Sequence, residues 1–125
     1  MKIFKTLLIL GLILLTTKTF GQYLPPSYQP MLNEIVTNFE TIVGSNSISQ
    51  GKNTLSVVSK DKIALRVEHK GKVKNLTFEM QPDEENKLQW VAANPLTIDM
   101  VNKYEAYLTK TLESMHKLSD KKSKE

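Results

Sequence analysis

The sequence predicts an α+β fold: a two-layer sandwich in which a four-stranded antiparallel meander carries N- and C-terminal helices on one face. Three observations lead to this prediction. Apolar residues recur at helical spacing near both ends of the chain. Between them, four short segments alternate apolar and polar residues, as half-buried strands do. The links between these segments are too short for parallel crossovers, so neighbouring strands are antiparallel and the element order is α-β-β-β-β-α.

The first helix is expected over residues 30–43. Pro30 suits the first turn, because its missing N–H would be unpaired there in any case, and Gly44 favours the helix end. One apolar stripe connects the two ends: Leu32, Ile35, Val36, Phe39, Ile42 and Val43. Residues 45–52 are rich in Ser, Asn and Gly, and we expect them to form a loop.

The four strands are rich in β-branched and aromatic residues. They are expected over residues 54–59, 62–69, 72–80 and 87–93. The first two links have only two residues each and suit tight hairpins, whereas residues 82–86 form a longer polar loop.

Each strand has one mainly apolar parity, which we expect to face the helices. Trp90 lies on this parity with Leu88 and Ala92, so it belongs to the expected core. The opposite parity is polar and faces water or a partner. The residues of this expected partner face are Arg66, Glu68, Asn75, Thr77 and Glu79.

The last helix is expected over residues 95–118, with Asn94 as the N-cap and Pro95 in the first turn. Its apolar stripe is Met100, Val101, Tyr104, Leu108, Leu112 and Met115. Residues 119–125 contain no apolar residue and are expected to form a disordered tail. Together with an extended, proline-containing lead-in over residues 22–29, this leaves residues 30–118 as a single α+β domain.

Residues 1–21 have the layout of a secretory signal peptide. Lys2 and Lys5 precede an uncharged, mainly apolar run over residues 6–17, and Gly21 ends a short cleavage region, so Gln22 is the expected new N-terminus. A transmembrane helix needs about 20 apolar residues, more than this run supplies. We therefore expect export to the periplasm or the medium with no stable membrane span after cleavage; retention as an uncleaved anchor is the alternative.

The chain contains no cysteine, which excludes disulfides, thiolate metal sites and lipidation at a cysteine. Together with the short leader, this composition is typical of a bacterial envelope protein. Three of the 17 basic residues leave with the leader, so 14 remain against 13 acidic ones. Such a balance does not predict nucleic-acid binding, which usually requires a clearly basic domain.

No pattern of residues predicts catalysis, a metal site or a cofactor. His69 and His116 each stand near the end of an element without a second ligand nearby, and we expect both to be exposed polar residues. The acidic run 83–86 is too short for a calcium loop and is expected to be a solvated hairpin tip. Glu68 and Glu79 fall on adjacent strands and are the one carboxylate pair that a small hydrolase would use.

The sequence thus predicts an exported, non-catalytic binding or protein-interaction module of the cell envelope. Its expected partner face would contact a protein that the sequence does not identify. The alternative is a small-molecule carrier with a pocket between helices and sheet, and a small hydrolase is the less favoured third function. The expected pocket residues are Phe39, Phe78, Trp90 and Tyr104.

Overall fold

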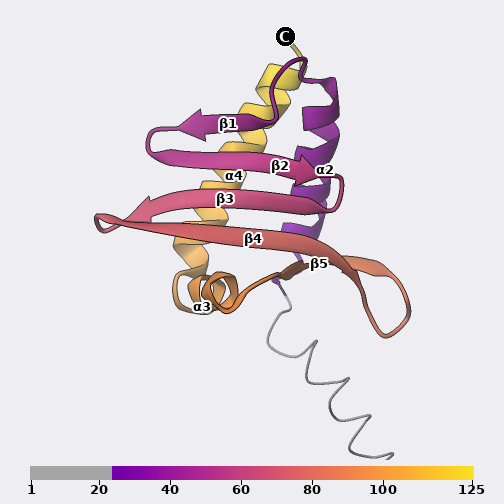
Figure 1. Ribbon diagram of the computed structural model, residues 1–125, viewed down its shortest axis with the longest axis vertical. Helices are drawn as coiled ribbons and strands as arrows, with labels where there is room; N and C mark the ends of the chain where they lie inside the picture. The colour runs from indigo at the N-terminus through magenta and orange to yellow at the C-terminus, as the bar shows by residue number, and fades with distance from the viewer. Residues whose placement is uncertain (1–23) are drawn as a thin grey trace, which may run out of the picture.

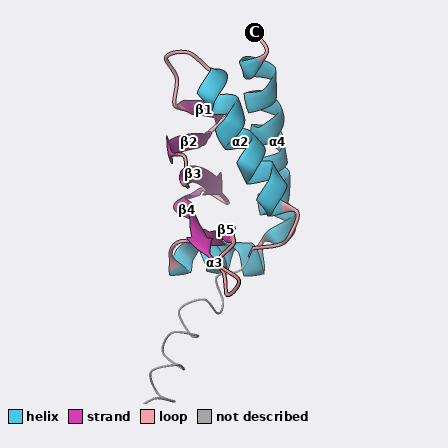
Figure 2. Ribbon diagram, turned by 90° about the vertical axis from the view of Figure 1, so that its right-hand side faces the viewer, coloured by secondary structure: helices cyan, strands magenta, loops and turns pink. Residues whose placement is uncertain are grey.

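A computed structural model describes residues 24–125, which form a sheet with helices on one of its faces (Figures 1 and 2). The predicted leader and its cleavage site at Gly21–Gln22 lie outside the described residues. The structure confirms the α+β class with one strand more than expected. The elements are α2 (Tyr28–Thr41), β1 (Ser47–Gln50), β2 (Asn53–Ser59), β3 (Lys62–His69), β4 (Lys72–Pro82), β5 (Leu88–Ala92), α3 (Pro95–Lys103) and α4 (Glu105–Ser123).

The five strands form an antiparallel meander in the order β1-β2-β3-β4-β5. Short links enforce this order, and the β3–β4 turn is an example. Lys70 and Gly71 have φ angles of 53° and 77°, both positive, as a two-residue type I′ hairpin requires. Helices α2 and α4 pack side by side on one face of this sheet, which leaves the other face bare (Figure 2).

Strand β1 lies in the segment that was expected to be a loop, so that expectation is wrong. Ile48 is opposite Leu55 of β2 and is only 4% exposed, because it enters the core from the edge of the sheet. The flanking Ser47 and Ser49 point away from the core. Ile48 is the only apolar residue among the four residues of β1, so the sequence shows no alternation of apolar and polar residues there. The segment becomes a strand because it pairs with β2.

Helix α2 begins at Tyr28, two residues earlier than the sequence indicates. The Tyr28 side chain is fully buried, and its hydroxyl lies 3.1 Å from the Thr109 hydroxyl on α4. Its backbone N–H donates to Pro25 O at 2.9 Å, so a turn precedes the helix. Residues 28 and 29 of the expected extended lead-in are therefore helical.

The C-terminal helix is divided at Tyr104, whose φ and ψ of −129° and 40° are not helical. Helix α3 lies at the lower end of the sheet, and α4 runs back across its covered face (Figure 1). Helix α4 continues to Ser123, so the expected disordered tail over residues 119–125 is wrong for most of its length. Ser119 is fully buried, accepting a hydrogen bond from Asn38 Nδ2 at 3.0 Å and donating one to His116 O at 2.8 Å.

The core lies between the sheet and the two long helices. The apolar parity faces it as expected: the buried strand residues include Leu55, Ile63, Leu65, Val67, Leu76, Phe78, Trp90 and Ala92. Leu88, the first residue of β5 and opposite Pro82, is the exception at 63% exposure.

Helix α3 begins where β5 ends and covers part of the edge of β4. Strand β5 pairs with β4 only from Phe78 to Pro82. Beyond it, the Thr77 N–H donates to the Thr97 hydroxyl at 2.9 Å, and that hydroxyl donates to Asn94 Oδ1 at 2.9 Å. Asn94 Oδ1 also caps α3 by accepting from the Thr97 N–H at 2.8 Å. One fully buried threonine thus joins the helix start to the strand edge.

Among residues 24–125, no helix has the length and apolar content needed to cross a membrane.

Candidate functional site

The five residues of the expected partner face lie on one side of the sheet. Arg66 on β3 is opposite Asn75 on β4, and the same register pairs Ala64 with Thr77. Directly opposite residues project to the same face. Glu68 and Glu79 share the parity of these residues. The side they share is the bare one, away from α2 and α4 (Figure 2).

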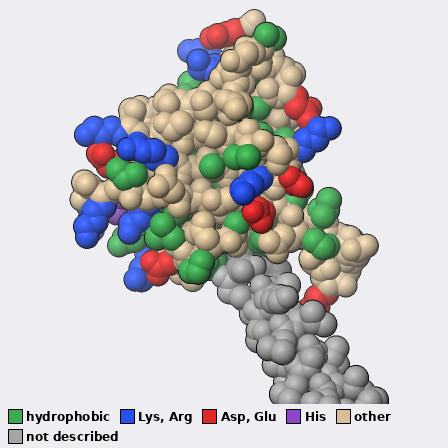
Figure 3. All heavy atoms as spheres, in the orientation of Figure 1, with side chains coloured by type: hydrophobic (Ala, Val, Ile, Leu, Met, Phe, Trp, Pro, Cys, Tyr) green, Lys and Arg blue, Asp and Glu red, His purple; other side chains and the backbone are tan. Residues whose placement is uncertain are grey.

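We define the open face as the polar-parity side chains of β1 to β4, seen from the front in Figure 3. Several of its members, among them Ser56, Ala64 and Thr77, have short side chains. The members are Ser47, Ser49, Thr54, Ser56, Lys62, Ala64, Arg66, Glu68, Val73, Asn75, Thr77 and Glu79. The Ser49 and Thr54 hydroxyls lie 2.9 Å apart across β1 and β2. This pair is the start of a hydroxyl-rich region on that half of the sheet.

Two ion pairs neutralise the carboxylates of the open face. Glu68 Oε2 lies 3.2 Å from Lys52 Nζ, and Glu79 Oε1 lies 3.6 Å from Lys62 Nζ. Within the described part of the chain, Arg66 forms no ion pair, and its Nη1 donates to the Lys52 carbonyl at 3.0 Å. The open face therefore carries one guanidinium whose charge is not paired locally.

Basic side chains gather where the β3–β4 hairpin reaches the edge of the open face (Figure 3). This hairpin carries Lys70, Lys72 and Lys74 around Gly71. Lys70 and Lys72 are exposed, and none of the three forms an ion pair within residues 24–125. By register, Lys72 and Lys74 share the parity of buried Leu76, so these lysines make the tip of the hairpin positive rather than the open face itself.

Glu68 and Glu79, the pair that the less favoured hydrolase would use, do not lie close together. Glu68 is opposite Val73, whereas Glu79 is opposite Lys62, six positions away along β3. At about 3.3 Å per residue this separation is about 20 Å. Glycoside hydrolysis uses carboxylates about 5 to 10 Å apart. The two glutamates cannot act on one bond.

The expected pocket residues do not surround a common cavity. Phe78 and Trp90 are 0% and 1% exposed and belong to the core. The Trp90 indole Nε1 donates to Asn33 Oδ1 at 2.7 Å, which satisfies its polar atom. Tyr104 is partly buried, and its ring lies 4.9 Å from that of His69. Phe39 borders a surface pocket of about 220 Å³ at the far end of α2.

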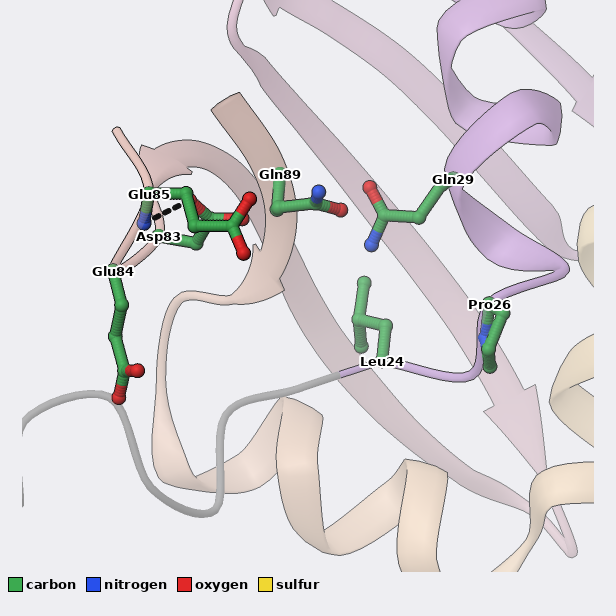
Figure 4. Close-up of a pocket in the computed structure, with 7 residues that line it drawn as sticks. All are labelled: Leu24, Pro26, Gln29, Asp83, Glu84, Glu85 and Gln89. Carbon is green, nitrogen blue, oxygen red and sulfur yellow. Dashed lines mark hydrogen bonds between the residues drawn. The ribbon is translucent and has the colours of Figure 1, made fainter. Parts of the chain in front are cut away.

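A second pocket, of about 430 Å³, lies between the start of α2 and the β4–β5 loop (Figure 4). Leu24, Pro26 and Gln29 form one side, and the loop with Gln89 forms the other. The side chains of Gln29 and Gln89 point toward each other across it (Figure 4).

Asp83 organises the acidic loop beside this pocket. Its Oδ1 accepts hydrogen bonds from the backbone N–H groups of Lys87 and Glu85, each at 2.9 Å. The bond from Lys87, the larger cause, and the bond from Glu85 both lower the pKa of Asp83. The loop is thus an ordered, solvated turn. Among residues 24–125, no three His, Cys, Asp or Glu side chains are grouped so that they could hold a metal ion.

Both histidines are partly buried, unlike the expected exposed residues. The His69 ring packs against Tyr107, with ring centroids 4.4 Å apart, and its Nε2 is buried without a hydrogen-bond partner in the described structure. The Tyr107 hydroxyl donates to Glu68 O at 3.1 Å, which links α4 to β3. His116 Nε2 lies 2.7 Å from Glu34 Oε2 and links α4 to α2. Both contacts join elements distant in sequence, and no local pattern signals them.

No family model, no curated protein and no solved structure matches this chain.

Proposed function

We propose that the chain is an exported, non-catalytic module of the cell envelope that binds a protein partner through the open face. The observation that supports this proposal is the arrangement of layers. Both long helices lie on one side of the sheet, so four neighbouring strands present polar side chains without cover (Figures 1 and 2). Solvated sheet faces are common in antiparallel folds. The composition of this face is the second observation in favour of a partner.

Arg66 is the proposed anchor of the interaction. It is exposed on β3, between Thr54 of β2 and Asn75 of β4. Arginine is enriched at protein interfaces, because a planar guanidinium forms several hydrogen bonds and keeps its charge. Glu68, two residues along the same face, is paired with Lys52, so Arg66 is available for a carboxylate or carbonyl of the partner. Asn75 and Thr77 add donors and acceptors beside it.

The ion-paired glutamates would form the rim of the interface. Exposed ion pairs contribute about 0–1 kcal/mol, so exchanging them for partner contacts changes the free energy little. We therefore expect Arg66 and Asn75 to dominate the affinity, and Glu68 and Glu79 to influence the association rate.

Site-specific photocrosslinking in the cells that make the protein tests this proposal. A photoreactive amino acid replaces Asn75 in one variant and Ser56 in another, both on the open face. Matched controls place it at Lys110 and Lys117, which are exposed on α4. The proposal predicts a discrete adduct from the open-face positions, lost when Arg66→Ala is added. Adducts from α4 alone would contradict it.

Export is tested separately by the mass of the protein recovered from those cells. A chain that starts at Gln22 is the expected result, and an intact leader would contradict cleavage. This outcome is independent of the crosslinking, so failure of one proposal does not obscure the other.

The carrier alternative requires space beside Trp90. The absence of exposed surface on Phe78 and Trp90 favours the interaction module over the carrier. Titration with apolar and aromatic ligands while Trp90 emission is recorded distinguishes the two. A saturable emission shift would favour the carrier, and the interaction module predicts an unchanged spectrum.

A further inference from the structure

Three turns lie together at one end of the sheet, at the left of Figure 1. They are the β1–β2 turn, the β3–β4 turn and the junction of α3 with α4. Lys52 Nζ of the first turn lies 3.2 Å from Glu68 Oε2 near the end of β3. The ring of His69, the last residue of β3, lies 4.9 Å from that of Tyr104 at the junction. Contacts between side chains thus hold the three turns side by side.

Basic residues outnumber acidic ones at this end of the molecule, which we call the turn end. It comprises the three turns and the strand and helix residues beside them. Six of its residues are basic and three are acidic, whereas the rest of the described chain has eight basic and ten acidic residues. The basic residues are Lys52, Arg66, Lys70, Lys72, Lys74 and Lys103, and the acidic ones are Glu68, Asp99 and Glu105. The described chain as a whole is nearly neutral, so its positive charge is concentrated here (Figure 3).

The β3–β4 turn carries three of these cations without a local partner. Lys70, Lys72 and Lys74 form no ion pair within residues 24–125. Val73 lies between two of these lysines and is 45% exposed. By register with β3, Val73 projects to the open-face side of the hairpin, and Lys72 and Lys74 project to the other side. A surface that meets the turn end-on therefore contacts the lysines and the valine together.

We propose that the turn end binds the surface of an anionic lipid bilayer. The lysines of the β3–β4 turn lie among the phosphate groups, and Val73 lies at their boundary with the hydrocarbon. The positive charge of the turn end is complementary to such a surface. The β3–β4 turn projects beyond the β1–β2 turn, so it suits a flat surface (Figure 1). Each lysine near an anionic membrane surface strengthens binding by about fivefold, so three contribute about 100-fold.

The chemistry of the turn favours lipid over an acidic protein as the occupant. A lysine ammonium is a point charge, which suits phosphate groups that move within a bilayer, whereas fixed carboxylates match the planar fork of arginine. Protein interfaces also have a core enriched in aromatic residues. The hairpin offers one exposed valine in place of such a core. An apolar side chain beside lysines is typical of segments that lie at a membrane surface.

Binding at the turn end leaves most of the open face accessible. Ala64, at the centre of the open face, is six residues from Lys70, which is about 20 Å at about 3.3 Å per residue. The strands therefore project away from the bilayer. This inference goes beyond the proposed partner binding and does not depend on it, because the three lysines are not members of the open face.

Cosedimentation of the full chain, as recovered from cells, with lipid vesicles tests this inference. Vesicles of phosphatidylcholine are compared with vesicles of about one part phosphatidylglycerol to two parts phosphatidylcholine. The neutral vesicles measure any binding by the apolar run 6–17. We expect tighter binding to the anionic vesicles at an ionic strength of about 0.1 M. This preference should be lost at about 1 M, where the screening length falls from about 10 Å to about 3 Å.

The triple variant Lys70→Gln/Lys72→Gln/Lys74→Gln should bind the anionic vesicles about 100-fold more weakly. The matched control Lys117→Gln/Lys121→Gln/Lys122→Gln makes the same change in net charge, on exposed residues of α4. These lysines lie about 18 Å or more along α4 from its start at the turn end, beyond the screening length, so the control should bind nearly as tightly as the wild type.

Labels on the valines test whether the turn itself meets the lipid. The chain has no cysteine, so Val73→Cys and Val58→Cys each accept one polarity-sensitive fluorophore. Val58 is 58% exposed and precedes Ser59, which is opposite Lys62 at the other end of β3. We expect a blue shift of the emission on anionic vesicles for the label at position 73 and none for the label at position 58.

Three results would overturn the inference. The wild type could show no preference for the anionic vesicles, the two triple variants could bind equally, or the two labels could shift equally. If the wild type bound soluble polyglutamate but not the anionic vesicles, an acidic polypeptide would replace lipid as the occupant, and the inference would be wrong.

Discussion

The side-chain amide of Gln29 forms two hydrogen bonds with the backbone of Trp90. Gln29 Nε2 donates to Trp90 O at 2.8 Å, and the Trp90 N–H donates to Gln29 Oε1 at 2.7 Å. Strand β5 is the last strand of the sheet, and the outward-facing backbone groups of Trp90 have no strand to pair with. Gln29 takes the place of that missing strand and attaches the start of α2 to the sheet.

Gln29→Ala should therefore lower the free energy of unfolding by about 1–3 kcal/mol, because partly buried backbone groups lose their partners. Gln29→Glu retains an acceptor for the Trp90 N–H but places a carboxylate oxygen against Trp90 O, so its loss at neutral pH should be at least as large as that of Gln29→Ala. Urea unfolding measures both variants, with an unchanged m-value as the sign that only stability is affected. A Gln29→Glu variant as stable as the wild type would contradict the two-bond account.

The Thr97 hydroxyl accepts the hydrogen bond of the Thr77 N–H, where a neighbouring strand would otherwise supply a carbonyl, and it should therefore contribute to the free energy of unfolding. Thr97→Val keeps the shape but leaves the Thr77 N–H without its acceptor, and we expect a loss of about 1–3 kcal/mol. Thr97→Ser keeps the hydroxyl and removes one methyl group, which costs about 0.8 kcal/mol. Hydrogen exchange at the Thr77 amide provides the residue-specific measurement. It should accelerate in Thr97→Val and change little in Thr97→Ser.

Tyr28 should make the fold sensitive to alkali. Burial raises the pKa of Tyr28 above its ordinary value of 10.0; Glu105 adds to this effect and the hydrogen bond with Thr109 opposes it. A pKa that is higher in the folded state means that stability is fully present below pH 10 and falls as the pH rises through the folded pKa. Tyr28→Phe should lose about 1 kcal/mol near neutral pH but show a smaller further decrease above pH 10. Denaturant unfolding between pH 7 and 11 measures this difference; parallel curves would contradict the role of Tyr28.

Ile48 tests whether β1 is part of the folded structure. Ile48→Ala should lower stability by about 2–5 kcal/mol, because a nearly buried side chain leaves a cavity. Ser49→Ala, at the exposed neighbouring position, is the control and should change stability by less than about 0.5 kcal/mol. If both substitutions were neutral, this segment would be the loop that the sequence indicates.

The end of α4 gives a similar test. Removal of residues 119–125 deletes buried Ser119 and its bond with Asn38, and we expect a loss of about 1 kcal/mol or more. Removal of residues 124 and 125 alone, beyond the helix, should have no measurable effect. Thermal unfolding of the two truncated chains compares them directly, and equal melting temperatures would contradict the contribution of Ser119.

Part of the open face follows from the sequence, because alternation along a strand assigns each side chain to a face. Arg66, Asn75 and Thr77 lie together for that reason. Their availability for a partner does not follow, since it depends on which ion pairs form across the sheet. The separation of Glu68 and Glu79 also required the register, because parity alone permits both near and distant arrangements.

The expected pocket, in contrast to the open face, did not follow from the sequence. Phe78 and Trp90 were correctly assigned to the apolar parity, but an apolar position does not indicate whether it lines a cavity or fills the core. Packing between α2, α4 and the sheet decides this. Only the structure shows that Phe39, at the end of α2, borders an open pocket.

The sequence by itself determined the fold class, the antiparallel order of the strands and the parity that faces the core. These features depend on the period of the hydrophobic pattern and on link length, both of which are local. The tertiary structure alone decided that Ser47–Gln50 is a strand, that the last helix is divided at Tyr104, and that Gln29 completes the edge of β5. Each of these features depends on contacts with residues distant along the chain. The local pattern of apolar and polar residues does not indicate which distant residues will make these contacts.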